Sequence, residues 1–343
     1  MNYDEIMKSI TQGLTGDFDT DRQYLMNQME NYKDHDLGKE IVRACGRLLY
    51  SILPEDKKEE IARVMQTDEL GVEATLDEVR FNIYKKDYEK ADVLMKALVT
   101  KVEDLEKSGM FQDDTVSMYF TFNGFFEELL YITRNKPKKD VRRSEIPFAE
   151  IYLQYGSLLF ELKRYEEARE MLRKAMRWNP CSAQIAFEYA ETYKVIGDLE
   201  GFLQVSINTF KVAYTPDTVA RCYRNLACYF VEKQLWSEAM ACNLMSLQYD
   251  HNSPNAMSEM YYIQQKTNGS VPEPGVEELR AYSEKYGFPL GADDDILGIA
   301  YGYGRRFLED EQYEAAKYFF TILYNLTDDE EIKNIIDKIP EKE

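Results

Sequence analysis

The sequence predicts an all-α protein, an α-α superhelix built from stacked helix pairs, with additional helices at the N-terminus. Apolar residues recur at spacings of three and four rather than in strict alternation, which is typical of helices and not of strands. Gly and Pro fall between these periodic runs. One pattern of large and small residues also occurs four times along the chain. Its first recurrence comes after about 34 residues, and a repeat of that length indicates helix-turn-helix units.

Length and charge narrow the class of protein. The 343 residues suffice for two domains or for one elongated array. Lys and Arg number 42 against 62 Asp and Glu, so the formal net charge of -20 disfavours binding to nucleic acid or to anionic membrane surfaces. The N-terminus has no basic segment followed by an apolar run, and no stretch reaches the roughly 18 apolar residues of a membrane-spanning helix. We therefore expect a soluble, cytoplasmic protein.

The cysteines and histidines favour neither disulfides nor a metal site. An odd number of cysteines without a CxxC pair fits reduced thiols, and two histidines are too few for a typical zinc site. We expect packing thiols, no bound metal and no cofactor. The residues concerned are Cys45, Cys181, Cys222, Cys228, Cys242, His35 and His251.

The segment 1–70 is predicted to be helical but of unassigned type. Periodicity predicts helices over residues 4–12, 19–32, 37–52 and 55–66. The third has one apolar face, made by Ile41, Cys45, Leu48, Leu49 and Ile52.

Residues 71–134 are predicted to form a degenerate repeat region with helices over 76–85, 88–106 and 114–134. The last contains "SMYFTFNGFFEELLYI", which is apolar almost all round and so predicts a buried helix. The following basic run, "RNKPKKDVRRSEIP", leads to a predicted connector at 135–147. A solvated connector is the favoured interpretation, and a docking site for an anionic partner is the alternative.

The best-formed repeat unit covers residues 149–180. Its first helix carries Tyr152, Tyr155, Gly156 and Leu159, and its second opens with Tyr165 and Ala168. Residues three and four apart share a helix face, so each helix presents an apolar seam to the other. The small residues Gly156 and Ala168 are expected where the two helices approach most closely.

The same order of large and small residues returns in three further units. It is carried by Ala186, Tyr189, Ala190 and Tyr193, then by Tyr223, Leu226, Ala227 and Phe230, and finally by Ala300, Tyr303, Gly304 and Phe307. Upstream, Tyr88, Ala91, Met95 and Leu98 repeat the second-helix pattern. On these residues the chain resembles the tetratricopeptide repeat family. The resemblance implies a repeat domain over 148–343, closed by a C-terminal capping helix.

The resemblance also implies a concave groove lined by inward-pointing residues of each first helix. Such arrays bind proteins or peptides, so we expect a non-enzymatic scaffold with a protein or peptide partner. Carried over by position, the groove candidates are Leu153, Ser157, Phe160, Phe187, Glu191, Lys194, Arg221, Arg224, Asn225, Cys228, Tyr301, Arg305 and Leu308. Any of these residues could instead pack between units.

Some family members clamp the C-terminal carboxylate of chaperones with Lys, Asn and Arg side chains. Arg221 and Asn225 fall near clamp positions, but Leu153 and Ser157 stand where Lys and Asn are required. That ligand is therefore not expected. Arg221, Arg224 and Arg305 remain candidates to meet another acidic or C-terminal group.

No catalytic motif is evident. Repeat positions account for Gly302–Gly304, and Asp293–Asp295 directly precedes a predicted helix, where Asp caps backbone donors. An enzymatic domain within the segment 1–130 is disfavoured. An alternative function is the peptide-sensing half of a bacterial regulatory system. In that case the DNA-binding part would be a separate partner, because the acidic N-terminus of this chain shows no recognition helix.

Overall fold

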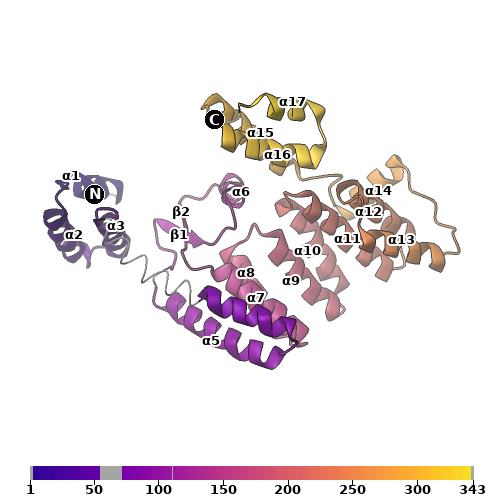
Figure 1. The fold of residues 1–343 in the computed structure, drawn as a ribbon, viewed down its shortest axis with the longest axis horizontal. Helices are drawn as coiled ribbons and strands as arrows, with labels where there is room; N and C mark the ends of the chain where they lie inside the picture. The colour runs from indigo at the N-terminus through magenta and orange to yellow at the C-terminus, as the bar shows by residue number, and fades with distance from the viewer. Residues whose placement is uncertain (1–2, 55–71, 110, 341–343) are drawn as a thin grey trace. The chain divides into compact units, whose positions relative to one another are not determined.

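The computed structural model describes residues 3–54, 72–109 and 111–340 (Figure 1). The chain divides into two compact units. The first comprises Met1–Thr121 with Pro137–Ile151, and the second comprises Phe122–Lys136 with Tyr152–Glu343. The predicted helix over 55–66 lies outside the described residues.

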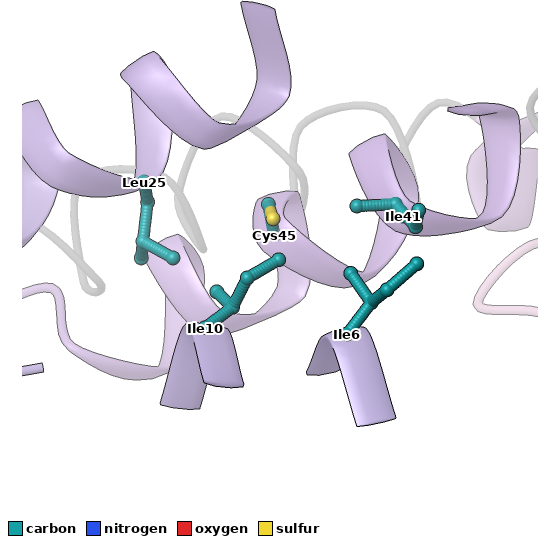
Figure 2. Packing of buried hydrophobic residues seen from close by; sticks show 5 residues of the cluster. All are labelled: Ile6, Ile10, Leu25, Ile41 and Cys45. Carbon is teal, nitrogen blue, oxygen red and sulfur yellow. The ribbon is translucent and has the colours of Figure 1, made fainter. Parts of the chain in front are cut away.

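The first unit begins with three short helices around a small core of their own. These are α1 (Tyr3–Gln12), α2 (Phe18–Tyr32) and α3 (Gly38–Ser51). Figure 2 shows the side chains that all three helices contribute, with the predicted apolar face of α3 directed at α1. That face is confirmed, because Ile41 and Cys45 are buried while Leu48, Leu49 and Ile52 pack at the edge of the core. The core residues are Ile6, Ile10, Leu25, Ile41 and Cys45.

A buried carboxylate fixes the turn between α1 and α2. Asp21 is 1% exposed and accepts hydrogen bonds from the backbone N–H groups of Thr15 at 2.7 Å and Gly16 at 2.8 Å. These bonds lower the pKa of Asp21, with the bond from Thr15 as the largest cause. The unit continues with a helix at residues 72–84 and with α5 (Tyr88–Lys107).

The expectation that the chain has no strand is wrong at two places. Strand β1 (Ser117–Phe120) pairs in parallel with β2 (Asp140–Arg143), and Met118 faces Val141 in the register. The helix expected over 114–134 is therefore shortened to α6 (Phe125–Asn135), which begins at Gly124. A short apolar run does not distinguish a buried strand from a buried helix, because both are apolar on every side. Strand β2 lies within the basic segment expected to be a connector.

The second unit has the predicted helix pairs, and the fold is an α-helical repeat fold (Figure 1). Helix α7 (Phe148–Glu161) begins in the first unit and leads to α8 (Tyr165–Trp178). The following pairs are α9 (Ala183–Val195) with α10 (Leu199–Thr209), then α11 (Pro216–Glu232) with α12 (Trp236–Tyr249). The short helix η1 (Phe210–Val212) precedes α11. The remaining helices are α13 (Pro254–Lys266), α14 (Val276–Tyr286), α15 (Asp294–Glu309), α16 (Tyr313–Thr327) and α17 (Glu330–Lys338).

One backbone signature recurs at the turn inside each pair. The second residue of each turn is left-handed, and the next residue donates its N–H to the carbonyl oxygen five positions earlier, which satisfies an end of the first helix. Only one of these positions is a glycine. The left-handed residues are Lys163, Gly197, Gln234 and Glu311 in the second unit, and Lys86 in the first.

Helix α13 ends with the same turn although its pair is interrupted. Asn268 is left-handed and lies one repeat length after Gln234, and Gly269 donates to the carbonyl of Gln264. An insertion follows in place of a second helix. Helix α14 then packs on α12, where the Tyr286 hydroxyl donates to Glu238 at 3.2 Å.

The last helix pair, α15 and α16, packs on α6 and η1. The rings of Phe125 and Phe319 lie edge to face, with their centroids 6.2 Å apart. Arg134, at the end of α6, pairs with Asp293 and with Asp295. Asp293 caps α15 as predicted, since its carboxylate accepts from the backbone of Asp295 at 3.0 Å. Helix α17 stands where the C-terminal capping helix was predicted, and its Ile332 is buried.

The predicted close approach of α7 and α8 occurs at Gly156. A Cβ atom on this glycine would lie 2.7 Å from Cγ of Leu172 and 3.3 Å from the carbonyl oxygen of Ala168. Both neighbours are fully buried. A side chain at position 156 would therefore push the two helices apart.

A buried carboxylate ties α6 to the turn after α8. Glu127 is 3% exposed and accepts from the side-chain amide of Asn179 at 2.8 Å and from the backbone N–H of Asn123 at 2.7 Å. The carbonyl oxygen of the Asn179 side chain accepts from the backbone N–H of Cys181 at 3.2 Å. Asn179 therefore connects two elements that are far apart in the sequence.

We expect Gly156→Ala to lower the free energy of unfolding by about 1–3 kcal/mol, because the added methyl group overpacks the α7–α8 contact. Urea unfolding measures the change. The matched control is Gly302→Ala in α15, where nothing lies within 4 Å of the added atom. That change should stabilise the protein by up to about 1 kcal/mol through helix propensity. Equal effects at the two sites would contradict the close approach.

We expect Asn179→Ala to lower the free energy of unfolding by about 1–3 kcal/mol, because Glu127 would lose a buried donor. Thermal and urea unfolding both report this change. Asn208→Ala on exposed α10 surface serves as the control and should change stability by less than about 0.5 kcal/mol. A negligible effect of Asn179→Ala would show that Asn179 does not hold α6.

Candidate functional site

Three of the predicted groove residues line one open polar pocket in the second unit. The pocket has a volume of about 370 Å³ and is lined by residues of α11 and α13. Arg221, Arg224 and Asn225 come from α11, and Asn255 and Glu259 come from α13. We refer to these five residues as the polar pocket.

The repeat spacing places these side chains in columns. Arg221 and Asn255 are one repeat length apart, as are Asn225 and Glu259 (255 − 221 = 259 − 225 = 34). The same step backwards from Arg221 and Asn225 leads to Phe187 and Glu191 on α9, and then to Leu153 and Ser157 on α7. Since equivalent positions of stacked repeats face the same way, each column runs from helix to helix.

Arg221 is held at the pocket by two contacts with α9. Its guanidinium lies 4.4 Å from the centre of the Phe187 ring and 3.3 Å from the carboxylate of Glu188. A stacked, ion-paired guanidinium is preorganised, because the ring and the carboxylate restrict its rotamers. About a third of the side chain is exposed, so it can still receive a ligand.

Arg224 is anchored more firmly than Arg221. Its Nη1 lies 3.1 Å from the hydroxyl of Ser246, 3.2 Å from Asp250 and 3.3 Å from the hydroxyl of Ser253. These partners connect α11 to the end of α12 and to the turn before α13. Arg224 therefore has a structural role as well as a place in the pocket.

The two asparagines differ in burial. Asn225 is 7% exposed, and its amide nitrogen donates to the Ser206 hydroxyl at 3.4 Å. Asn255 is exposed at the start of α13. Asparagine side chains both donate and accept, so they suit the N–H and C=O groups of a peptide backbone.

Glu259 lies in the pocket wall without an ion-pair partner among the described residues. Its Oε2 accepts from the side-chain amide of Asn243 at 3.0 Å. Burial raises the pKa of Glu259, against the opposing effects of the Asn243 hydrogen bond and the Lys194 charge. Asn243 is fully buried, and its Oδ1 is the one buried side-chain polar atom without a hydrogen-bond partner in the described part of the chain. The Glu259 end of the pocket thus offers a carboxylate acceptor.

The remaining candidates on α7, α9 and α11 are half-buried or buried. Glu191 and Lys194 form an ion pair at 2.5 Å. Leu153 is 5% exposed, Ser157 is half-buried, and the Phe160 ring meets Tyr165 edge-on at 5.3 Å. Burial raises the pKa of Cys228 to about 11, which makes this thiol unreactive at neutral pH.

The candidates on α15 lie apart from the polar pocket, whose lining includes no α15 residue. Arg305 is half exposed, and its guanidinium contacts the Tyr301 hydroxyl at 3.5 Å and Glu309 at 3.1 Å, all on α15. Leu308 is half-buried. The prediction that these residues line the same groove assumes that the repeats stack without interruption, whereas α15 packs on α6 and η1.

Three residues at this site are not among the groove residues predicted from the sequence, namely Asn255, Glu259 and Asn243. The step of one repeat length from Arg221 and Asn225 was the signal for the first two. The Pro-rich insertion after α13 obscured it. For Asn243, a buried amide on α12, no local signal exists.

Within the described residues, no group of three or more His, Cys, Asp and Glu side chains could hold a metal ion. In the same part of the chain, no helix is both long and apolar enough to cross a membrane.

The helix pairs of the second unit place this chain among the helical-repeat proteins, and the polar pocket lies on the first helices of these pairs. Residues 149–180 match the family model "Tetratricopeptide repeat". The predicted resemblance is confirmed, and the match falls on the best-formed of the units from which it was drawn. None of the curated proteins compared with the chain matches it.

Three solved structures are similar to this chain at low sequence identity. PilF of Pseudomonas aeruginosa is 13% identical with a TM-score of 0.39, over 78% of this chain and 96% of PilF. TTC0263, a thermophilic TPR protein of Thermus thermophilus, is 12% identical with a TM-score of 0.29, over 56% of this chain and 98% of that one. The APC/C hetero-tetramer Cut9-Hcn1 contributes a chain that is 11% identical with a TM-score of 0.34, over 99% of this chain and 60% of that one.

The pKa shift of Glu259 predicts how stability depends on pH. The folded protein keeps the Glu259 carboxyl group protonated up to a higher pH than the unfolded chain does. Above this raised pKa, the charged carboxylate therefore destabilises the fold. Glu259→Gln keeps an acceptor for Asn243 and removes the charge. We expect it to raise the free energy of unfolding at pH 7, and to do so less at pH 4.5.

Urea unfolding of both proteins at the two pH values tests this expectation. Glu170→Gln, at an exposed position on α8, is the control and should change stability little at either pH. A stability gain from Glu259→Gln that is the same at both pH values would contradict the role of burial.

Proposed function

We propose that this protein is a non-enzymatic, cytoplasmic scaffold that binds a peptide or an extended segment of a partner protein along α9, α11 and α13. Tetratricopeptide-like folds generally mediate protein–protein interactions. The observation that carries the proposal is the polar pocket, in which two guanidinium groups and a carboxylate share one cavity without pairing with each other. Groups of opposite charge that do not pair with each other across a pocket favour a ligand that reaches both.

A peptide segment has the required chemistry. An acidic side chain or a C-terminal carboxylate can meet Arg221 and Arg224, because guanidinium groups bind carboxylates with two parallel hydrogen bonds. Backbone N–H groups or a basic side chain can then meet Glu259. The stacking of Arg221 on Phe187 supports this role, since preorganisation reduces the entropy lost on binding.

We expect Arg221→Glu to weaken peptide binding by about 30-fold or more, because a central interface arginine contributes about 2 kcal/mol or more. Peptides selected from a random displayed library on the native protein would be measured by calorimetry against each variant. Arg221 is a better test than Arg224, since Arg224 also holds α12 and the following turn.

Arg173→Glu on α8 is the matched charge-reversal control, because Arg173 is 59% exposed and its ion pair is with Glu170 on the same helix. Selected peptides that bind Arg221→Glu as tightly as the native protein would refute the site. Arg305→Glu tests separately whether α15 contributes. One short peptide bound far more tightly than all others would favour the alternative, in which the chain is the sensing half of a regulatory system with a separate DNA-binding partner.

A further inference from the structure

A second cavity of the second unit lies between α12 and the start of α14. It has a volume of about 440 Å³, and its walls are one face of α12 and the segment that joins the insertion to α14. Cavities of this size are large enough to receive a ligand or the anchoring side chains of a partner. We refer to it as the apolar groove, which is lined by Ala241, Leu244, Met245, Gln248, Val276 and Leu279 among others.

The α12 wall of the groove is apolar at positions where the second helix of the best-formed unit is charged. Ala168 on α8 and Ala239 on α12 occupy the same position of the repeat, 71 residues apart (239 − 168 = 71). The same step pairs Glu170 with Ala241, Arg173 with Leu244, Lys174 with Met245, and Arg177 with Gln248. A helix surface that faces water carries charges, whereas an apolar stripe at spacings of three and four is typical of a surface that another element covers.

The segment opposite α12 covers this stripe only in part. Pro274 and Leu279 are half-buried, but Val276, the first residue of α14, is 70% exposed. Gln248 on the α12 wall is exposed as well. An exposed apolar side chain at the rim of a cavity enlarges the apolar area that a partner can bury.

The groove has the length of a short helix. Its α12 wall runs from Ala241 to His251, and a helix rises about 1.5 Å per residue, so the wall extends over roughly 15 Å. About three turns of a partner helix would lie along this wall. Such a helix would direct apolar residues at spacings of three and four into the cavity, as amphipathic helices do in other hydrophobic grooves.

The rim of the groove on the α14 side is acidic. Glu273, Glu277 and Glu278 are exposed and belong to the segment that forms this wall. Arg280 pairs with Glu277 at 3.4 Å, so one guanidinium group stands against three carboxylates. An excess of negative charge beside an apolar groove favours a partner whose apolar residues are flanked by Lys or Arg.

We propose that the apolar groove binds an amphipathic helix of another protein, which inserts its apolar face into the cavity and directs Lys or Arg side chains to the acidic rim. A second copy of this chain is a poorer occupant, since it would bring two acidic rims together. The groove shares no residue with the polar pocket, so the two proposals stand or fall separately.

The probe is a labelled, end-blocked peptide of about 14 residues, long enough to form a helix on binding, with leucine at spacings of three and four and lysine elsewhere. Fluorescence anisotropy measures its binding to the full chain. Gln248→Lys/Val276→Lys places two cations in the groove at exposed positions, where they should not disturb folding. We expect this variant to bind at least about tenfold more weakly, because it repels the lysines of the probe and removes an apolar contact.

The matched control for this variant is Val195→Lys/Asn208→Lys. It replaces one apolar and one polar residue at exposed positions of α9 and α10, changes the net charge equally, and should bind as the native protein does. Equal losses in the two variants would overturn a local site.

The acidic rim is tested by Glu273→Lys/Glu277→Lys, which should bind at least about fivefold more weakly, and added salt should weaken native binding. Its control is Glu166→Lys/Glu170→Lys on α8, because Glu170 pairs with Arg173 three positions on, as Glu277 does with Arg280. This control should bind as the native protein does. A probe with glutamate in place of lysine that binds as tightly would overturn the choice of a basic partner.

A scrambled probe of the same composition, with its leucines on every side of the helix, should bind the native protein at least about tenfold more weakly. This arm needs no variant, so it remains decisive whatever the substitutions do to folding. Equal binding of the two probes would overturn the groove in favour of general attraction to an acidic chain. Absence of probe binding to the native protein, or a native dimer that Gln248→Lys/Val276→Lys separates into monomers, would overturn the choice of a partner helix.

Discussion

Each helix pair must reverse its direction within a short turn, because the apolar faces of its two helices are covered only when the helices lie antiparallel and in contact. A left-handed residue in the middle of the turn achieves this reversal, and the bond that follows satisfies a carbonyl at the end of the first helix. Lys163, Gln234 and Glu311 adopt this conformation without the freedom of glycine. Packing of the two helices therefore outweighs a local cost of about 1 kcal/mol at each turn.

The fixed turn also sets the register of the side chains that could meet a ligand. Since equivalent positions are separated by whole repeats, Arg221 on α11 and Asn255 on α13 face one cavity. The pocket combines anchored cations with a partly buried carboxylate, so its charge pattern depends on the stacking of three helices and on no single loop.

Much of the fold could be predicted because its determinants are local. The size and spacing of Tyr152, Gly156 and Ala168 alone predict a helix pair. They also predict the close contact of the two helices at Gly156. The strand β1 could not be recognised, since an apolar run with no polar face fits either secondary structure. The partner of Glu127 could not be foreseen either, because Asn179 lies far along the chain. In the candidate site, the repeat pattern predicted Arg221 and Asn225. It did not predict Glu259, because the insertion after α13 obscures the repeat.

The insertion that interrupts the pair begun by α13 lies after the turn at Asn268, and Gln264 holds it by donating to the Val271 carbonyl at 2.9 Å. The additional residues therefore lengthen the chain downstream of every side chain in the polar pocket. Length variation at this point leaves the recognition columns in register. Residues 272–274, between the buried Val271 and the N-cap Gly275 of α14, are thus a graft point, where a new loop or a reporter peptide could be introduced without rebuilding the polar pocket.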